Sequence, residues 1–171
     1  ASTVDAVCGE AGLSKKYFYE DFHTRDELFA ALAEQLIDKI ITGVIGSVGG
    51  PDVDLLQRLR DAFGCVVALL VDDPRNARLF TEVVGSDLLV DTLGSAERKL
   101  AGLLVDTILA HIGGTLHERK RLHVVALVII VGTAQAVTDW LDGAIELSRA
   151  DLVDELATMS TAAARTIRPD L

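Results

Sequence analysis

From about residue 25 to its end, the chain repeats apolar side chains at intervals of three and four residues. No segment alternates apolar and polar residues with a period of two. The repeats are interrupted at residues 47–51, 72–74 and 113–114 and at Gly143, and each interruption carries a glycine or a proline. Without strands to pair, the apolar residues can be buried only between helices, so the sequence predicts an all-α fold.

The first of these helices spans residues 25–45. Its apolar stripe consists of Leu28, Leu32, Leu36, Ile40 and Val44. Further helices are predicted at residues 53–71, 76–83, 88–112, 116–141 and 149–167. With 171 residues, half of them apolar and three of them proline, the chain can bury a sizeable core. The longest apolar run, residues 124–132, is shorter than the roughly 18 residues of a membrane helix, so we expect a buried helix and no membrane partner.

The N-terminal residues predict two short helices joined by a tight turn. Residues 3–11 place Val4, Val7, Cys8 and Ala11 on one helical face. Ser2 or Thr3 can cap this helix, and Gly12 fits the position just past its end, where a left-handed conformation is required. Ser14 can cap the second helix, which gives the spacing of a helix-turn-helix.

Within the second helix the aromatic residues divide between two faces. Phe18 and Phe22 lie four residues apart and can anchor the helix to the first one. Lys15, Lys16, Tyr17 and Tyr19 are then left to face outward. Basic and aromatic side chains on an exposed short helix are suited to contact with DNA.

The run Ala11-Gly12-Leu13-Ser14, followed by Tyr19, Phe22 and Arg25-Asp26-Glu27-Leu28, resembles the DNA-binding end of the TetR family of bacterial transcriptional regulators. The resemblance implies that the helix from Ser14 enters the major groove, that Tyr19 and Arg25 hold phosphates, and that the side chains of residues 15–17 approach base edges. The residues expected at the DNA are Thr3, Ser14, Lys15, Lys16, Tyr17, Tyr19, His23, Thr24 and Arg25.

Three features depart from the family pattern. The family usually has lysine where Arg25 stands, and Glu20 and Asp21 place two carboxylates on the recognition helix. Such a carboxylate can accept from cytosine N4 or face solvent. The family also places one more helix before Thr3, so we expect the DNA-binding unit, residues 1–25, to be incomplete at its N-terminus. Residues 26–171 form the predicted ligand-binding and dimerisation domain, with residues 26–45 as the connecting helix.

The charge of the chain argues against indiscriminate coating of nucleic acid. The net charge is −10 and the isoelectric point is about 4.7. Residues 1–25 carry only −1 of this, from three basic and four acidic side chains. Because nonspecific affinity comes mainly from lysine and arginine, we expect sequence-specific, salt-dependent binding at one end of the molecule.

The last two helices predict a homodimer. Each carries apolar residues at helical spacing, and pairs of such helices can form a four-helix bundle across a two-fold axis, as the family's dimer does. The alternative is that both helices close a monomeric core. The expected interface residues are Leu122, Ala126, Ile129, Thr133, Ala136, Trp140, Leu152, Leu156, Met159 and Ala163. A dimer would place two helix-turn-helix units about one DNA turn apart, which suits a palindromic operator in double-stranded DNA.

The central helices predict the walls of a ligand pocket. The expected residues are Phe63, Val66, Val67, Leu70, Leu79, Phe80, Val83, Leu104, Ile108, Val131 and Gln135. Each of them can equally be plain core. Gln135 lies within an apolar helix and needs a partner, which can be a ligand, Thr138 or the other subunit. Few aromatic and charged residues occur here, so the expected effector is a small, uncharged or weakly polar and largely hydrophobic molecule.

The resemblance implies a ligand-responsive transcriptional regulator, most often a repressor that a small molecule releases from its operator by moving the helix of residues 25–45. The alternative is an all-helical module for small-molecule or protein binding without DNA. Cys8 and Cys65 favour a reducing, cytoplasmic setting. His117-Glu118 begins a zinc-protease helix but Arg121 stands where the second histidine belongs, so we expect no enzyme, no metal and no cofactor.

Overall fold

A computed structural model describes residues 3–47, 53–112 and 115–167. The described residues contain eight α-helices, one short 3-10 helix and no strand, which confirms the all-α fold. The helices are α1 (Val4–Ala11), α2 (Lys15–Asp21), α3 (Arg25–Ser47), α4 (Leu55–Val71), α5 (Pro74–Val84), η1 (Asp87–Leu89), α6 (Val90–Ile112), α7 (Leu116–Leu141) and α8 (Arg149–Arg165).

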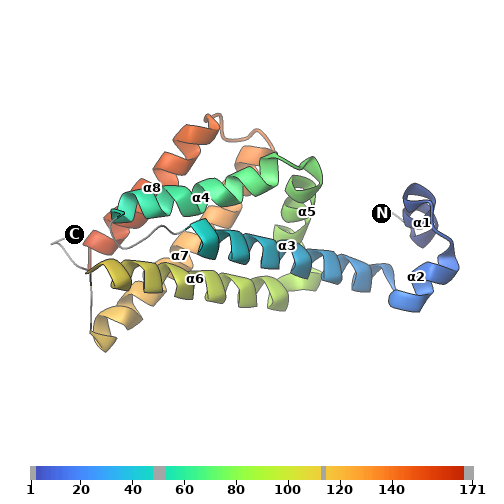
Figure 1. The fold of residues 1–171 in the computed structure, drawn as a ribbon, viewed down its shortest axis with the longest axis horizontal. Helices are drawn as coiled ribbons and strands as arrows, with labels where there is room; N and C mark the ends of the chain where they lie inside the picture. The colour runs from blue at the N-terminus through green and yellow to red at the C-terminus, as the bar shows by residue number, and fades with distance from the viewer. Residues whose placement is uncertain (1–2, 48–52, 113–114, 168–171) are drawn as a thin grey trace.

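Helix α3 joins two unequal parts of the molecule. Figure 1 shows α1 and α2 at one end of α3, away from the bundle that the other helices form. In that bundle the most extensive packing is between α4 and α8, between α6 and α7, and between α3 and α4. Helix α3 is therefore the connection between the α1–α2 unit and the bundle.

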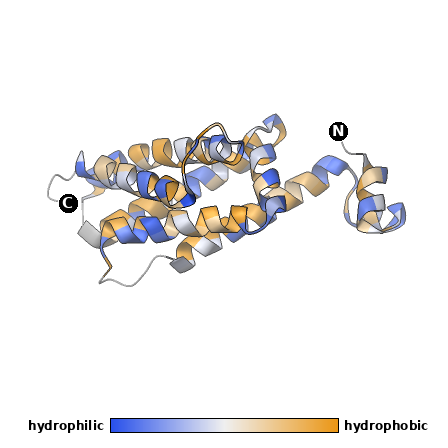
Figure 2. Cartoon of the chain, turned by 90° about the horizontal axis from the view of Figure 1, so that it is seen from above, coloured by the Kyte–Doolittle hydropathy of each residue, from blue (hydrophilic) through white to orange (hydrophobic). Residues whose placement is uncertain are grey.

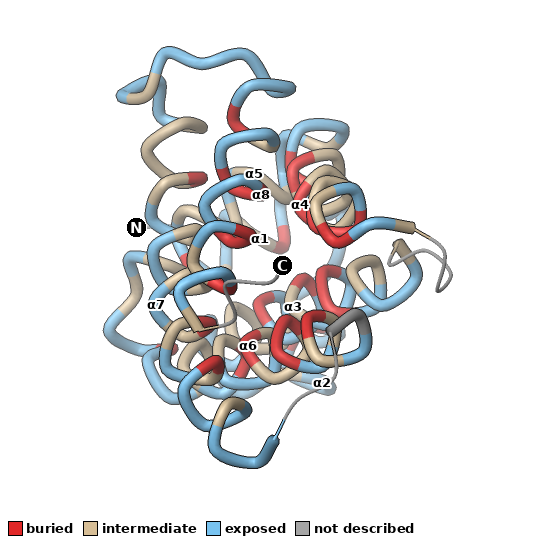
Figure 3. The backbone as a smooth tube through the Cα atoms, turned by 90° about the vertical axis from the view of Figure 1, so that its left-hand side faces the viewer, coloured by how far each residue is buried: buried red, intermediate tan, exposed pale blue. Residues whose placement is uncertain are grey.

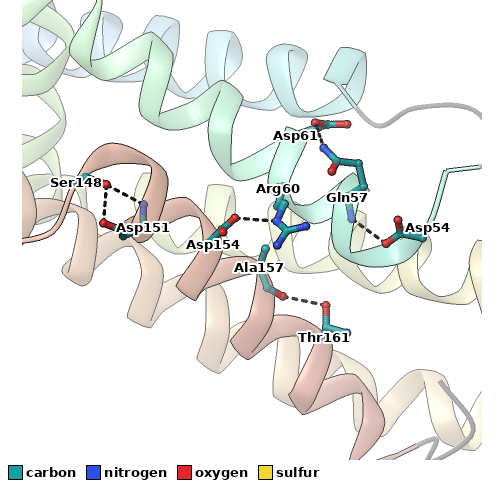
Figure 4. Close-up of polar contacts among 9 residues, drawn as sticks. All are labelled: Asp54, Gln57, Arg60, Asp61, Ser148, Asp151, Asp154, Ala157 and Thr161. Carbon is teal, nitrogen blue, oxygen red and sulfur yellow. Dashed lines mark hydrogen bonds and ion pairs between the residues drawn. The ribbon is translucent and has the colours of Figure 1, made fainter.

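Side chains at the helix starts explain where several helices begin. Asp54 caps α4 by accepting from the amide of Gln57 at 3.1 Å, and Ser148 caps α8 by accepting from the amide of Asp151 at 3.1 Å (Figure 4). Thr115 and Glu118 form a reciprocal capping box at the start of α7. These caps satisfy amides that have no partner inside the helix.

The predicted boundaries differ from the observed ones by a few residues. Helix α5 begins at Pro74 rather than at residue 76, because Asp73 caps it and proline suits the first helical turn. The predicted helix 88–112 is preceded by η1, so α6 begins at Val90. Gly143, with φ of 78°, lies just after α7 as predicted. Ser2 and the predicted breaks at 48–51 and 113–114 lie outside the described residues.

The main core lies between α3, α4, α6, α7 and α8, and Figure 3 shows the buried positions concentrated on the facing sides of these helices. Helix α8 contributes two hydroxyl residues to it, Ser160 and Thr161. Each donates to the carbonyl four residues earlier, Ser160 to Leu156 at 2.7 Å and Thr161 to Ala157 at 2.9 Å. Because these bonds satisfy the hydroxyls within the helix, the residues can face the core.

Helix α7 is less buried than its sequence predicts. Among its described residues only Leu122, Ala126 and Val137 are buried, whereas the apolar Val124, Val128 and Val131 are exposed. Figure 2 shows that hydrophobic residues occupy much of the length of the helices in the bundle. By length and composition α7 is also the one helix in the described part of the chain that could cross a membrane. Its packing against α6, α5 and α8 instead places it in the helical bundle. The run of residues 124–132, which was expected to lie in a buried helix, is therefore only partly buried within the single chain.

Candidate nucleic-acid interface and internal cavity

The corner between α1 and α2 is built by local hydrogen bonds. Thr3 caps α1 through its hydroxyl, which accepts from the amide of Ala6 at 3.2 Å. Gly12 has φ of 66°, a conformation that glycine adopts without steric cost. The amide of Leu13 then donates to the carbonyl of Cys8 at 2.9 Å. The predicted turn is confirmed, whereas Ser14 occupies the capping position of α2 without a side-chain hydrogen bond.

Aromatic packing separates an inner face of α2 from an outer one. Phe18 is buried, and its ring lies 5.9 Å from that of Phe22 and 5.3 Å from that of Tyr19. Tyr17 and Tyr19 remain 59% and 53% exposed. The predicted outward position of both tyrosines is confirmed, and their hydroxyls are accessible to a partner.

Acidic neighbours lie beside the basic residues of this unit. Lys15 pairs with Asp5 of α1, and this hydrogen bond and charge raise the pKa of the lysine above its ordinary value. Lys16 lies 3.9 Å from Glu20, one helical turn further on. Glu20, whose role the sequence left open, thus faces solvent beside a lysine. These exposed pairs are weak and can exchange for phosphate contacts.

The start of α3 fixes three further residues of the predicted interface. The Thr24 hydroxyl accepts from the amide of Glu27 at 3.1 Å, and the amide of His23 donates to the Glu27 carboxylate at 2.6 Å. Arg25 contacts Asp26 at 3.2 Å. The arrangement caps α3 and places the Arg25 guanidinium at the end of α3 that follows α2.

Replacing Asp5 by asparagine tests the acidic neighbours. Because the amide no longer holds the Lys15 ammonium, we expect duplex DNA to bind about two- to fivefold more tightly at low salt, with the gain shrinking as salt rises. Fluorescence anisotropy with labelled duplex measures the change. Glu10→Gln, an equal loss of charge at an exposed site on α1, is the control. Equal gains for both variants would assign the effect to net charge alone.

An apolar cavity of about 120 Å³ lies inside the bundle, between α3, α4, α5, α6 and α7. The pocket residues predicted from sequence that line it are Phe63, Val66, Phe80, Val83 and Leu104. Helix α3 supplies a wall that the sequence did not single out, through Leu36, Ile37, Ile40 and Val44. Helix α3 therefore both follows the α1–α2 unit and forms one side of the cavity.

The other predicted pocket residues lie elsewhere. Val67, Leu70 and Ile108 are buried in the core, and Leu79 packs beside it. Val131 is exposed, so it faces away from the cavity. Gln135 is exposed too, and its amide donates to Asp139 at 2.8 Å, one turn along the same helix. Thr138 is not this partner, because its hydroxyl donates to the carbonyl of Ala134 at 3.0 Å.

Three polar residues line the cavity: Glu97, Thr107 and Thr133. The sequence signal for Glu97 was its place on the inward stripe of α6, with Leu93, Leu100 and Leu104 at steps of three and four. Partial burial raises the pKa of the Glu97 carboxyl, and neighbouring Arg98 opposes the shift. Within the described residues, no three His, Cys, Asp or Glu side chains are placed to share a metal ion.

Several residues predicted for a dimer interface are buried inside the single chain. They are Leu122, Ala126, Leu152 and Leu156. Thr133 lines the cavity, while Ile129 and Trp140 are half-buried against the core. The Trp140 indole donates to the carbonyl of Leu147 at 2.8 Å and so anchors the connection to α8. Ala136 and Ala163 are also half-buried, and Met159 is exposed.

A second apolar stripe of α7 faces solvent. Val124, Val128 and Val131 are 63%, 70% and 48% exposed, and they lie at steps of four and three. A helix face of this kind suits packing against another helix. The sequence analysis missed it because the opposite stripe of α7 has the same spacing and more bulky residues.

No family model matches the chain. A comparison with curated proteins finds 26% identity over 140 residues to the HTH-type transcriptional activator FasR of Mycolicibacterium smegmatis. The match covers 79% of this chain and 62% of the relative, so the chain spans less than two thirds of the relative's length. A distant relationship to a helix-turn-helix transcriptional regulator agrees with the corner between α1 and α2.

Proposed function

We propose that this protein is a DNA-binding transcriptional regulator. The observation that carries the proposal is the α1–α2 corner, in which Gly12 turns the chain and Phe18 anchors α2 so that its outer face stays exposed. The distant match to a regulator named as helix-turn-helix type supports the same reading. Helix α2 would enter the major groove, with residues 15–17 toward base edges and Tyr19 and Arg25 on phosphates.

The proposed DNA-binding form is a homodimer in the cytoplasm. A seven-residue α2 reaches only a few base pairs, so a single α1–α2 unit would discriminate poorly between DNA sequences. Two such units held about 34 to 36 Å apart would read a palindrome with combined affinity. The exposed stripe of Val124, Val128 and Val131 supports a contact between copies through α7. Covering this stripe would also remove the apolar surface from water.

The proposed effector is a small hydrophobic molecule in the cavity. Leu36 and Ile40 of α3 form part of the cavity wall, so a ligand in the cavity contacts α3 directly and can favour a displaced position of this helix. The α1–α2 unit then moves with α3, and the distance between the two α1–α2 units of the dimer changes. A ligand that binds the displaced form more tightly by about 1 to 3 kcal/mol would weaken operator binding roughly 5- to 150-fold.

We propose repression as the direction of control, because a dimer bound over a promoter blocks polymerase. The relative bears the name of an activator, so repression and activation have to be distinguished by the position of the operator. Footprinting locates the operator relative to the transcription start: a site that overlaps the start supports repression, whereas a site wholly upstream supports activation.

Arg25→Ala and Tyr19→Phe test the proposed DNA contacts. Because each change removes a proposed phosphate contact, we expect roughly tenfold weaker binding to the selected operator and to unrelated duplex alike. Circular dichroism should show unchanged helicity, since both side chains are exposed. The operator is first selected from genomic fragments with the unaltered protein, and anisotropy then gives the affinities.

Arg165→Ala is the matched control, because this arginine ends α8 at the end of the molecule away from α1 and α2 (Figure 1). Its binding should stay within twofold of the unaltered protein. If the unaltered protein selects no fragment at moderate salt, the all-helical module without DNA binding becomes the better account.

A further inference from the structure

A charged residue, Glu97, is among those that line a cavity whose surface is almost wholly apolar. Among the residues of α6 that line it, Leu93, Ala96, Leu100 and Leu104 surround Glu97 on the same helical face. A charged residue at such a position loses part of its contact with water, which costs free energy unless a partner replaces the lost hydrogen bonds. Glu97 is half-buried, so its side chain lies at the boundary between the cavity and the solvent.

No hydrogen bond or ion pair occupies the Glu97 carboxylate within the described part of the chain. Arg98 is its sequence neighbour, but the Arg98 guanidinium lies close over Gly94, one turn earlier on the helix. Burial raises the pKa of the Glu97 carboxyl, and the Arg98 charge limits that rise. The carboxylate is therefore a negative group at the cavity that no donor among the described residues neutralises directly.

The surface next to the cavity is also acidic. A shallow groove between α3 and α6 shares Ile37 and Ala96 with the cavity. This groove carries three acidic side chains and one basic side chain: Glu34, Asp38, Asp91 and Lys99. Its negative potential attracts cations and repels anions before they reach the cavity.

The volume of the cavity sets the size of the occupant. At about 120 Å³ it is slightly smaller than an apolar cavity of about 150 Å³ that holds benzene. A single ring or a short branched chain therefore nearly fills it. A carboxylate-bearing molecule of that size would place two negative charges together in an apolar setting.

We propose that the effector is a small hydrophobic amine, whose apolar body fills the cavity and whose ammonium group pairs with Glu97. This inference rests on the proposed function, in which the cavity is the effector site. An ammonium can donate to the Glu97 carboxylate, which has no hydrogen-bond partner among the described residues, and the acidic groove lies beside the cavity.

Three ligands with the same ring test the charge preference: benzylamine, benzyl alcohol and benzoate. Calorimetry at neutral pH, without DNA, should show that benzylamine binds about five- to tenfold more tightly than benzyl alcohol and that benzoate binds weakest. In Glu97→Gln the preference for the amine should disappear while benzyl alcohol binds as before. Glu155→Gln, which removes an exposed carboxylate on α8, should keep the preference.

Equal binding of amine and alcohol to the unaltered protein, tightest binding of benzoate, or no binding of any of the three would overturn the inference. A retained amine preference in Glu97→Gln would overturn the role of that residue. The proposed function is tested separately by adding benzylamine to the operator complex. Amine binding without DNA release supports the ligand class and contradicts the coupling between the cavity and the α1–α2 units, whereas lack of amine binding leaves operator selection unaffected.

Discussion

Val128→Glu is expected to leave the chain folded and to make it monomeric, with operator affinity falling about a hundredfold or more. Val128 is 70% exposed in the single chain, so a carboxylate there meets water and costs the fold little. Across a two-fold axis the same carboxylate would be buried against its own copy. Sedimentation gives the oligomeric state, and anisotropy with the full palindrome gives the affinity.

Val90→Glu is a closely matched control. Val90 is 60% exposed at the start of α6, where a carboxylate also suits the helix terminus. This variant should remain dimeric and bind the operator normally. A Val128→Glu protein that stays dimeric would contradict the α7 interface, and the contact between copies would then have to be sought on another face, such as that of Met159 on α8.

Helix α7 shows how far periodicity reaches. Its limits, Leu116–Leu141, were predicted correctly, because Thr115 caps one end and Gly143 follows the other. Its faces were not, because both stripes are apolar and spacing alone cannot say which one meets the rest of the chain. That choice depends on the packing of α6 and α5 against α7, which no local signal contains.

Helix α8 shows a different limit. The sequence predicted a stripe through Met159 and Ala163, but the structure turns Ser160 and Thr161 to the core instead. A hydropathy pattern counts hydroxyls as polar, although a hydroxyl bonded to its own helix loses much of that polarity. The buried stripe therefore coincides with the predicted one at Leu152 and Leu156 and is shifted by one residue from Met159 onward.

The N-terminal unit was the easiest part to predict, because its signals are local. Gly12 marks the corner, and Phe18 is placed four residues from Phe22. The cavity was harder: Phe63 and Phe80 were identified, whereas the wall from α3 and the carboxylate of Glu97 were not. A cavity is the space left where several helices cross, so its lining depends on distances that no single segment determines.

Leu122→Ala is expected to lower the free energy of unfolding by about 2 to 5 kcal/mol. Leu122 is 1% exposed in the single chain and belongs to the main core cluster, so truncation leaves a cavity that the surrounding helices cannot fully close. Urea unfolding followed by circular dichroism measures the loss, which is a large part of the stability of a typical domain. Because Leu122 faces inward, the oligomeric state in the absence of urea should not change.

Val124→Ala provides the comparison, since it shortens an apolar side chain on the same helix at a position that is 63% exposed. If the stripe of Val124 meets a second copy, this variant should weaken association while an isolated subunit keeps nearly all of its stability. The two substitutions then separate the two faces of α7: one acts on unfolding at any protein concentration, the other through the concentration at which dimers form. If Leu122→Ala left the free energy of unfolding unchanged but made the protein monomeric, the assignment of the two faces of α7 would be reversed. The stripe that contains Leu122 would then form the dimer interface.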